Sequence, residues 1–187
     1  MKPSLIFRLT IKFVVVVSLC TSFFTQARVT INSTRIVYPA NESEVTIQLN
    51  NEGAVPALVQ TWVDRGDASA QSHNADAPFL IKPPIFRLDP KKGQTVRLVF
   101  TGEALPQDRE TVFYFNALEI PPVSPATDES QIQVGVRSRL KLFYRPVGLP
   151  GNAANAAKQV KWTLVPVKNG YALRGDNASP YYVSYAG

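Results

Sequence analysis

A histidine with serine and aspartate residues nearby is the first candidate for chemistry in this chain, because these residue types can form a catalytic triad. His73 is the only histidine of the 187 residues, and it lies between Ser72 and Asn74 in a polar stretch. A triad needs a base that is held rigidly by a third group, whereas small polar residues are typical of a solvated loop. We expect no catalytic residue. An enzyme that uses this loop is kept as an alternative. Retained function of the His73→Ala variant would exclude it.

Three aspartates of the same stretch, Asp64, Asp67 and Asp76, have side chains that bind cations. Their spacing is not that of a calcium loop, and we interpret them as residues that keep a loop soluble. A structural zinc site needs about four cysteine or histidine ligands, but the chain has one of each. Phosphate-loop, dinucleotide-binding and G-x-S-x-G motifs are also absent from the sequence. The sequence therefore predicts no metal and no cofactor, and points to binding rather than catalysis.

Short strands separated by turns must position the residues that bind a partner. Residues 44–50 alternate strictly, with Val45, Ile47 and Leu49 on one face. No segment of ten or more residues has helical periodicity. These patterns predict an all-β sandwich with Greek-key connections. Further strands are expected at 55–63, 79–88 with a break at Pro83-Pro84, 95–100, 111–120, 131–145, 160–165, 171–174 and 181–185.

The first 27 residues have the pattern of a Sec-type signal peptide. Lys2, Arg8 and Lys12 are followed by an apolar run over residues 13–24 and by the small residues Thr25 and Ala27. The run is short against the roughly 20 residues that a spanning helix needs. We expect cleavage after Ala27, export and no membrane anchor.

The remaining 160 residues carry a formal net charge of +3 instead of +6 and contain no cysteine. That charge gives no case for nucleic-acid binding, and without disulfides the core must supply the stability. Residues 146–157 (PVGLPGNAANAA) read as a linker. The expected domains are therefore 28–148 and the start of a second β-sandwich at 149–187, which is incomplete against the roughly 100 residues typical of such a domain.

Four groups of residues, in this order and spacing, resemble the periplasmic pilus-assembly chaperones of the chaperone–usher pathway. They are residues 33–38 (STRIVY), 105–110 (LPQDRE), 113–116 (FYFN) with 120–122 (IPP), and 140–146 (LKLFYRP). The resemblance runs from about residue 28 to residue 185. It implies two immunoglobulin-like domains set at an angle, with a cleft between them. It also implies a function: binding pilus subunits in the periplasm, preventing their aggregation and delivering them to an outer-membrane usher.

The resemblance assigns a donor strand to residues 131–145. In this family the subunit lacks its last strand, and the chaperone lends one of its own to the open edge and groove. Ile132, Val134 and Val136 match the family's alternating hydrophobic donors. The alternative is that these three side chains face the core of their own sandwich, since alternation is shared by every half-buried strand.

The resemblance also assigns two pairs of charged residues. Arg35 and Lys141 match the pair that holds the subunit's C-terminal carboxylate. Lys141 is five residues from Val136, so strict alternation places the two on opposite faces unless a bulge intervenes, for which Gly135 and Ser138 are candidates.

Glu110 and Arg145 match two members of an inter-domain salt-bridge network, whose third member would fall beyond residue 187. The short connection at 123–130 resembles the class of chaperones that serve thick, rod-like pili.

Two further alternatives stay open. A secreted immunoglobulin-like adhesion domain would suit the three formal glycosylation sequons at Asn32, Asn41 and Asn177, and glycan mass on the native protein would identify it. The other alternative is a truncated relative with poor chaperone activity, because an incomplete second domain would remove one wall of the cleft. Whether an empty chaperone self-associates through its donor strand is also left open.

Overall fold

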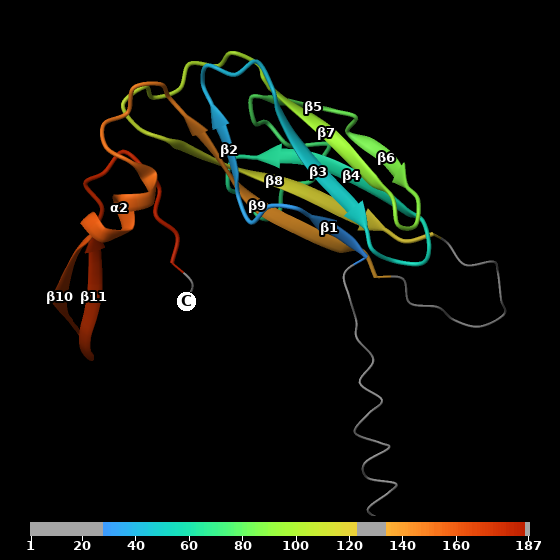
Figure 1. Cartoon of the computed structure of the whole chain (residues 1–187). Helices are drawn as coiled ribbons and strands as arrows, with labels where there is room; N and C mark the ends of the chain where they lie inside the picture. Colours follow the sequence, from blue (N-terminus) through green and yellow to red (C-terminus); the bar gives the residue numbers. More distant parts are fainter. Residues whose placement is uncertain (1–27, 123–133, 186–187) are drawn as a thin grey trace, which may run out of the picture.

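The computed structural model describes residues 28–122 and 134–185, and the region up to residue 145 forms a sandwich of two sheets (Figure 1). One sheet has the strand order β1-β3-β7-β5, and the other has the order β2-β9-β8-β4-β6. The strands of the first sheet are β1 (Val29–Ile31), β3 (Val45–Asn51), β7 (Gly93–Phe100) and β5 (Phe79–Lys82). Those of the second are β2 (Ile36–Pro39), β9 (Val136–Arg145), β8 (Thr111–Ile120), β4 (Ala57–Asp64) and β6 (Ile85–Leu88).

The alternating apolar residues meet between the two sheets. On β3, Ile47 and Leu49 are buried and Val45 packs against the same core. On the facing sheet, Phe113 and Phe115 of β8 are buried, and an edge-to-face contact joins Phe113 to Phe79 of β5. The prediction of an all-β sandwich is confirmed, because two amphipathic sheets bury their apolar faces only against each other.

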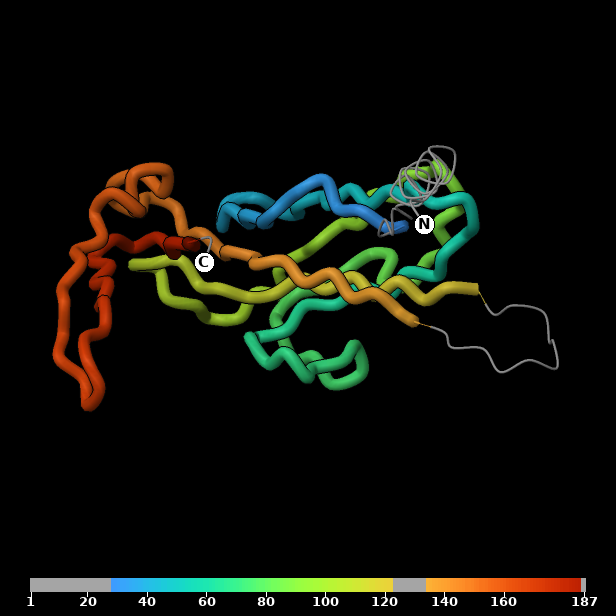
Figure 2. The backbone as a smooth tube through the Cα atoms, turned by 90° about the horizontal axis from the view of Figure 1, so that it is seen from below, coloured from blue at the N-terminus to red at the C-terminus, as the bar shows by residue number. Residues whose placement is uncertain are grey.

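The N-terminal segment changes sheets, and this change shapes the edge of the larger sheet. β1 pairs with β3 in the four-stranded sheet. After a bend, β2 pairs with β9 in parallel, from Ile36↔Leu142 to Pro39↔Arg145. Figure 2 shows the segment that begins at residue 28, in blue, running along one side of the sandwich. β2 therefore covers only the C-terminal end of β9.

Residues after the sandwich form a short helix and a hairpin. The helix α2 (Ala153–Gln159), which the sequence did not predict, begins within the segment interpreted as a linker. Asn152 starts the helix, because its Oδ1 accepts a hydrogen bond from the N–H of Ala154 at 2.8 Å, and the alanines that follow favour helix. β10 (Lys161–Val167) and β11 (Gly170–Asp176) then pair antiparallel.

The strand expected at 181–185 is not formed. Those residues are irregular, and the Tyr182 ring stacks on Phe143 of β9 with 5.7 Å between centroids. The strand expected at 131–145 begins at Val136, with residues 131–133 outside the described part of the chain. In the described residues, none of the helices has the length and apolar character to cross a membrane.

Candidate functional site

One edge of β9 is open over half of its length. β8 pairs with β9 from Val136 to Tyr144, whereas β2 pairs only with Leu142 to Arg145 on the other side. Over Val136–Lys141, no strand among the described residues occupies that second side. Figure 1 shows β2 reaching only the far end of β9. An open edge leaves backbone N–H and C=O groups unpaired, and such groups are a template for another strand.

The side chains of β9 alternate without interruption. The register against β8 is continuous from Val136↔Glu119 to Thr111↔Tyr144, so β9 has no bulge there. The bulge considered at Ser138 is therefore absent, and Val136 and Lys141 face opposite sides of the sheet. Val136 is on the side of the buried Leu142, toward the space between the sheets, and Lys141 is on the outer side.

The three expected hydrophobic donors have different positions in the structure. Val136 is the first residue of β9 and is 43% exposed, and Val134 precedes the strand and is 67% exposed. Ile132 lies outside the described residues, as does the short connection at 123–130. Both valine side chains are therefore accessible to solvent.

The two expected carboxylate-binding residues lie at neighbouring positions, Lys141 in β9 and Arg35 directly before β2. Arg35 immediately precedes Ile36, which pairs with Leu142, and Lys141 immediately precedes Leu142. Both side chains are exposed. The Arg35 side chain has no hydrogen bond or ion pair with a described residue, and Lys141 donates from Nζ to Ser184 Oγ at 2.9 Å. Two neighbouring cations with no acid between them can bind an anion through charge-assisted hydrogen bonds.

Glu110 and Arg145 are joined at the other end of β9. Arg145 Nε lies 2.7 Å from Glu110 Oε1, and the Glu110 side chain is 2% exposed. The second carboxylate oxygen accepts the N–H of Tyr182 at 2.7 Å, and the N–H of Glu110 donates to Pro180 O at 2.9 Å. The Arg145 guanidinium also lies over the Tyr181 ring. This buried carboxylate thus connects the sandwich to residues 180–182.

The position of Asp64 contradicts its interpretation as a solubilising loop residue. It is the last residue of β4 and is 1% exposed. Arg139 of β9 donates from Nη2 to its Oδ1 at 2.6 Å and from Nε to its Oδ2 at 3.2 Å. Asn116 of β8 donates to Oδ2 at 2.8 Å, and the N–H of Gly66 donates to Oδ1 at 2.7 Å. A buried carboxylate requires such partners, but the sequence placed Asp64 in a polar run without showing them.

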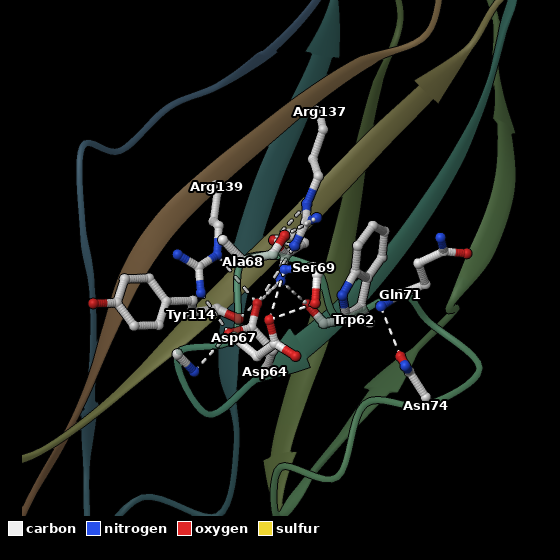
Figure 3. A network of polar contacts seen from close by, with 12 residues as sticks. Trp62, Asp64, Asp67, Ala68, Ser69, Gln71, Asn74, Tyr114, Arg137 and Arg139 are labelled. Atoms are coloured by element: carbon white, nitrogen blue, oxygen red, sulfur yellow. Dashed lines mark hydrogen bonds and ion pairs between the residues drawn. The ribbon is translucent and has the colours of Figure 1, made fainter.

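Arg137 completes this group of residues, of which Figure 3 labels Asp64, Arg137 and Arg139. Its guanidinium donates to Asn116 Oδ1 at 3.0 and 2.7 Å and to Ala68 O at 2.8 Å. The two arginines lie over aromatic rings, Arg139 over Tyr114 at 3.7 Å and Arg137 over Trp62 at 4.8 Å. We call Asp64, Asn116, Arg137 and Arg139 the outer-face network.

The electrostatics of Asp64 follow from these contacts. Burial acts to raise the pKa of its carboxyl group, but the hydrogen bonds from Arg139, Asn116 and Gly66 outweigh burial and hold the pKa below its usual value of 3.8. Asp64 is therefore charged at neutral pH.

The remaining polar candidates are on the surface. His73, Asp67 and Asp76 are exposed. Asp67 accepts hydrogen bonds from the N–H and hydroxyl of Ser69, which closes a local turn. Within residues 28–122 and 134–185, no group of three or more histidine, cysteine or acidic residues is arranged to hold a metal ion.

Comparison with known proteins gives a consistent result. The model of the pili and flagellar-assembly chaperone family, PapD N-terminal domain, matches residues 28–150. The chain is 42% identical over 164 residues to the probable fimbrial chaperone YadV of Escherichia coli K12, covering 86% of this chain and 67% of that protein. It is 44% identical over 164 residues to the chaperone protein FimB/FhaD of Bordetella pertussis, covering 85% and 66%.

A solved structure with a bound partner is also similar. The complex of the Salmonella enterica SafA pilin with the SafB chaperone contains a chain that matches with a TM-score of 0.71 and 29% identity. The match covers 86% of this chain and 72% of that one. These relatives are named as chaperones, and this chain spans about two thirds of the length of the two curated proteins.

Proposed function

Because this chain belongs to the pili and flagellar-assembly chaperone family, we propose that it captures pilus subunits in the periplasm by lending them β9 and passes them to an outer-membrane usher. The observation that carries the proposal is the open edge over Val136–Lys141. A subunit that lacks a strand has a complementary open edge, and pairing satisfies both sets of backbone groups.

The cation pair predicts the direction of the captured strand. If Arg35 and Lys141 bind the C-terminal carboxylate of the subunit, its last strand ends beside Lys141 and runs parallel to β9. That end also lies where β2 begins at Ile36, so the captured strand and β2 together would line the whole edge of β9. The carboxylate then fixes the register of the captured strand, because a slip of one residue would turn every side chain to the other face.

The hydrophobic contacts are proposed for the opposite face. Val136 and Val134 project from the open part of the edge, and the donor set continues to Ile132 by alternation. Filling an apolar groove with such side chains stabilises the pair by about 1.5–3 kcal/mol for each side chain that becomes fully buried. Backbone pairing would thus provide affinity, and the spacing of the valines would provide selectivity.

The rest of the chain has supporting roles in this proposal. Residues 1–27 direct export and are removed after Ala27. Residues 28–148 form the donor domain, and residues 149–187 begin a second domain held against it through Glu110 and Arg145. The work of the chaperone comes from binding and from subunit folding, without catalysis.

A peptide-binding experiment tests the proposal. The probe is a short fluorescent peptide of alternating valine and threonine, prepared with a free C-terminal carboxylate and, as the matched control, with a C-terminal amide. We expect residues 28–187 to bind the carboxylate form more tightly and to gain amide-exchange protection at 136–141 on binding. Equal binding of both peptides with no protection of β9 would contradict the proposal.

A further inference from the structure

The open half of β9 is an edge strand that is attached to its sheet by side chains as well as by backbone hydrogen bonds. Between Val136 and Lys141 it has hydrogen-bonded neighbours on one side only, from β8. Edge strands with one neighbour fray more readily than central strands. Yet the proposed function requires this half to be extended before a partner arrives, since every residue ordered during binding weakens the complex.

The outer-face network supplies a second attachment for this half. Arg139 extends from β9 across β8 to Asp64 of β4, and the Arg137 guanidinium lies 3.5 Å from Asp64 Oδ2 (Figure 3). Arg137 also donates to Asn116 on β8 itself. The contact of Arg139 with Asp64 uses two hydrogen bonds, and Asp64 is almost completely buried. The edge strand is therefore attached to the second strand beyond it, in addition to its immediate neighbour.

The position of the network along β9 is selective. Its two arginines lie within Val136–Lys141, the half that β2 leaves open, whereas the end covered by β2 holds the Arg145–Glu110 pair. Aromatic rings of Trp62 and Tyr114 lie under the arginines and restrict their side chains. Both guanidinium groups are thus engaged on the face away from Val136, and the open backbone edge is left uncovered.

We infer that Asp64 is a positioning residue, which holds the open half of β9 extended through Arg139 and Arg137 before a subunit binds. Asp64 itself does not touch the partner in this arrangement. The consequence for capture rests on the proposed function, whereas the effect on the free chain does not.

Amide exchange of the free chain, residues 28–187, tests the effect on β9 without any partner. Asp64→Asn keeps the shape of the side chain and removes its charge. Hydrogen bonds to a charged group stabilise more than neutral ones, so we expect exchange at 136–141 to become about tenfold faster or more. Exchange in β3, which belongs to the other sheet, should change far less. Asp89→Asn is the matched control, because Asp89 forms an exposed pair with Arg87 on the surface.

Two results would overturn the inference. One is unchanged exchange at 136–141 in Asp64→Asn. The other is an equal increase in β3 and β9, which would mean that Asp64 contributes only to overall stability. If Asp64→Asn does not fold, Arg139→Lys replaces it, since lysine keeps the charge but cannot donate the paired hydrogen bonds. The same regional pattern is expected for that variant, and its absence would overturn the inference equally.

Binding of the carboxylate peptide then separates the two proposals. We expect about tenfold weaker binding by Asp64→Asn than by the unaltered chain, with the preference for carboxylate over amide retained. Faster exchange at β9 with unchanged peptide affinity would overturn the role in capture. If the unaltered chain binds neither peptide, the proposed function fails, and the exchange result still decides whether Asp64 positions the strand.

Discussion

Val136 and Lys141 lie in one unbroken register on β9 and face opposite sides of the five-stranded sheet. The apolar contacts and the carboxylate contacts proposed for a captured strand therefore come from different faces. A substitution on one face leaves the other face in place, so the two contributions can be measured separately.

The cation pair is expected to matter for binding and not for folding. Arg35→Ala or Lys141→Ala should abolish detectable binding of the carboxylate peptide, because an exposed pair loses half of its charge. The free energy of unfolding should change by no more than about 0.5 kcal/mol, since neither side chain is in the core. Binding and urea denaturation measure the two effects. Arg97→Ala is the control, because Arg97 is exposed on the other sheet. Unfolding of both Arg35→Ala and Lys141→Ala would mean that Arg35 and Lys141 are structural residues.

The valines are expected to contribute through apolar contact. Val136→Asp should weaken binding of the peptide by about tenfold or more, because a carboxylate would enter an apolar contact unpaired. Its effect on the melting temperature should be small, since Val136 is already half exposed. Val147→Asp provides the control at an exposed valine outside the strands. Equal binding by both variants would place Val136 outside the interface.

Arg145 and Glu110 should be unequal in their effect on stability. Arg145→Ala leaves a buried carboxylate without its cation and should lower the free energy of unfolding by about 3 kcal/mol. Glu110→Ala leaves an arginine whose side chain is one-third exposed and can be solvated, so the loss should be smaller. Urea denaturation measures both values. A larger loss for Glu110→Ala would show that its bond to the Tyr182 N–H is the more important contact.

Asp64 predicts a pH dependence of stability. Its pKa in the folded chain lies below the ordinary 3.8, so the unfolded state takes up a proton more readily as the pH falls. The stabilisation from Asp64 should be complete above about pH 4 and should be lost as the pH falls through the folded-state value. Unfolding of the unaltered chain and of Asp64→Asn, compared from neutral pH to about pH 3, measures this difference.

Asp67 also bears on that comparison, because it lies close enough to Asp64 for the two charges to interact. Asp67 in the adjoining loop has a pKa below its ordinary value, caused mainly by hydrogen bonds from Ser69. The charge of Asp64 acts to raise that pKa, so Asp67 titrates in both proteins but at a lower pH in Asp64→Asn. A difference that is constant down to about pH 3 would contradict the assignment.

Local patterns in the sequence located most strands correctly. The strand expected at 111–120 matches β8, and Pro83-Pro84 separates β5 from β6 as predicted. The helix at Ala153–Gln159 was missed, because seven residues, about two turns, are too few to show periodicity. The strand expected at 181–185 was wrong, since Tyr182 is held by Phe143 and Glu110 instead of by a neighbouring strand.

The sequence by itself determined the all-β class, the family and the residue types at the edge, because alternation and motif spacing are local properties of the chain. Only the tertiary structure decided that β2 begins its pairing with β9 at Ile36 and leaves Val136–Lys141 open, since the order of strands in a sheet depends on distant segments. It also decided that Asp64 is buried beneath Arg139. A polar residue after a strand reads as a loop until the partners that neutralise its charge are brought to it by the fold.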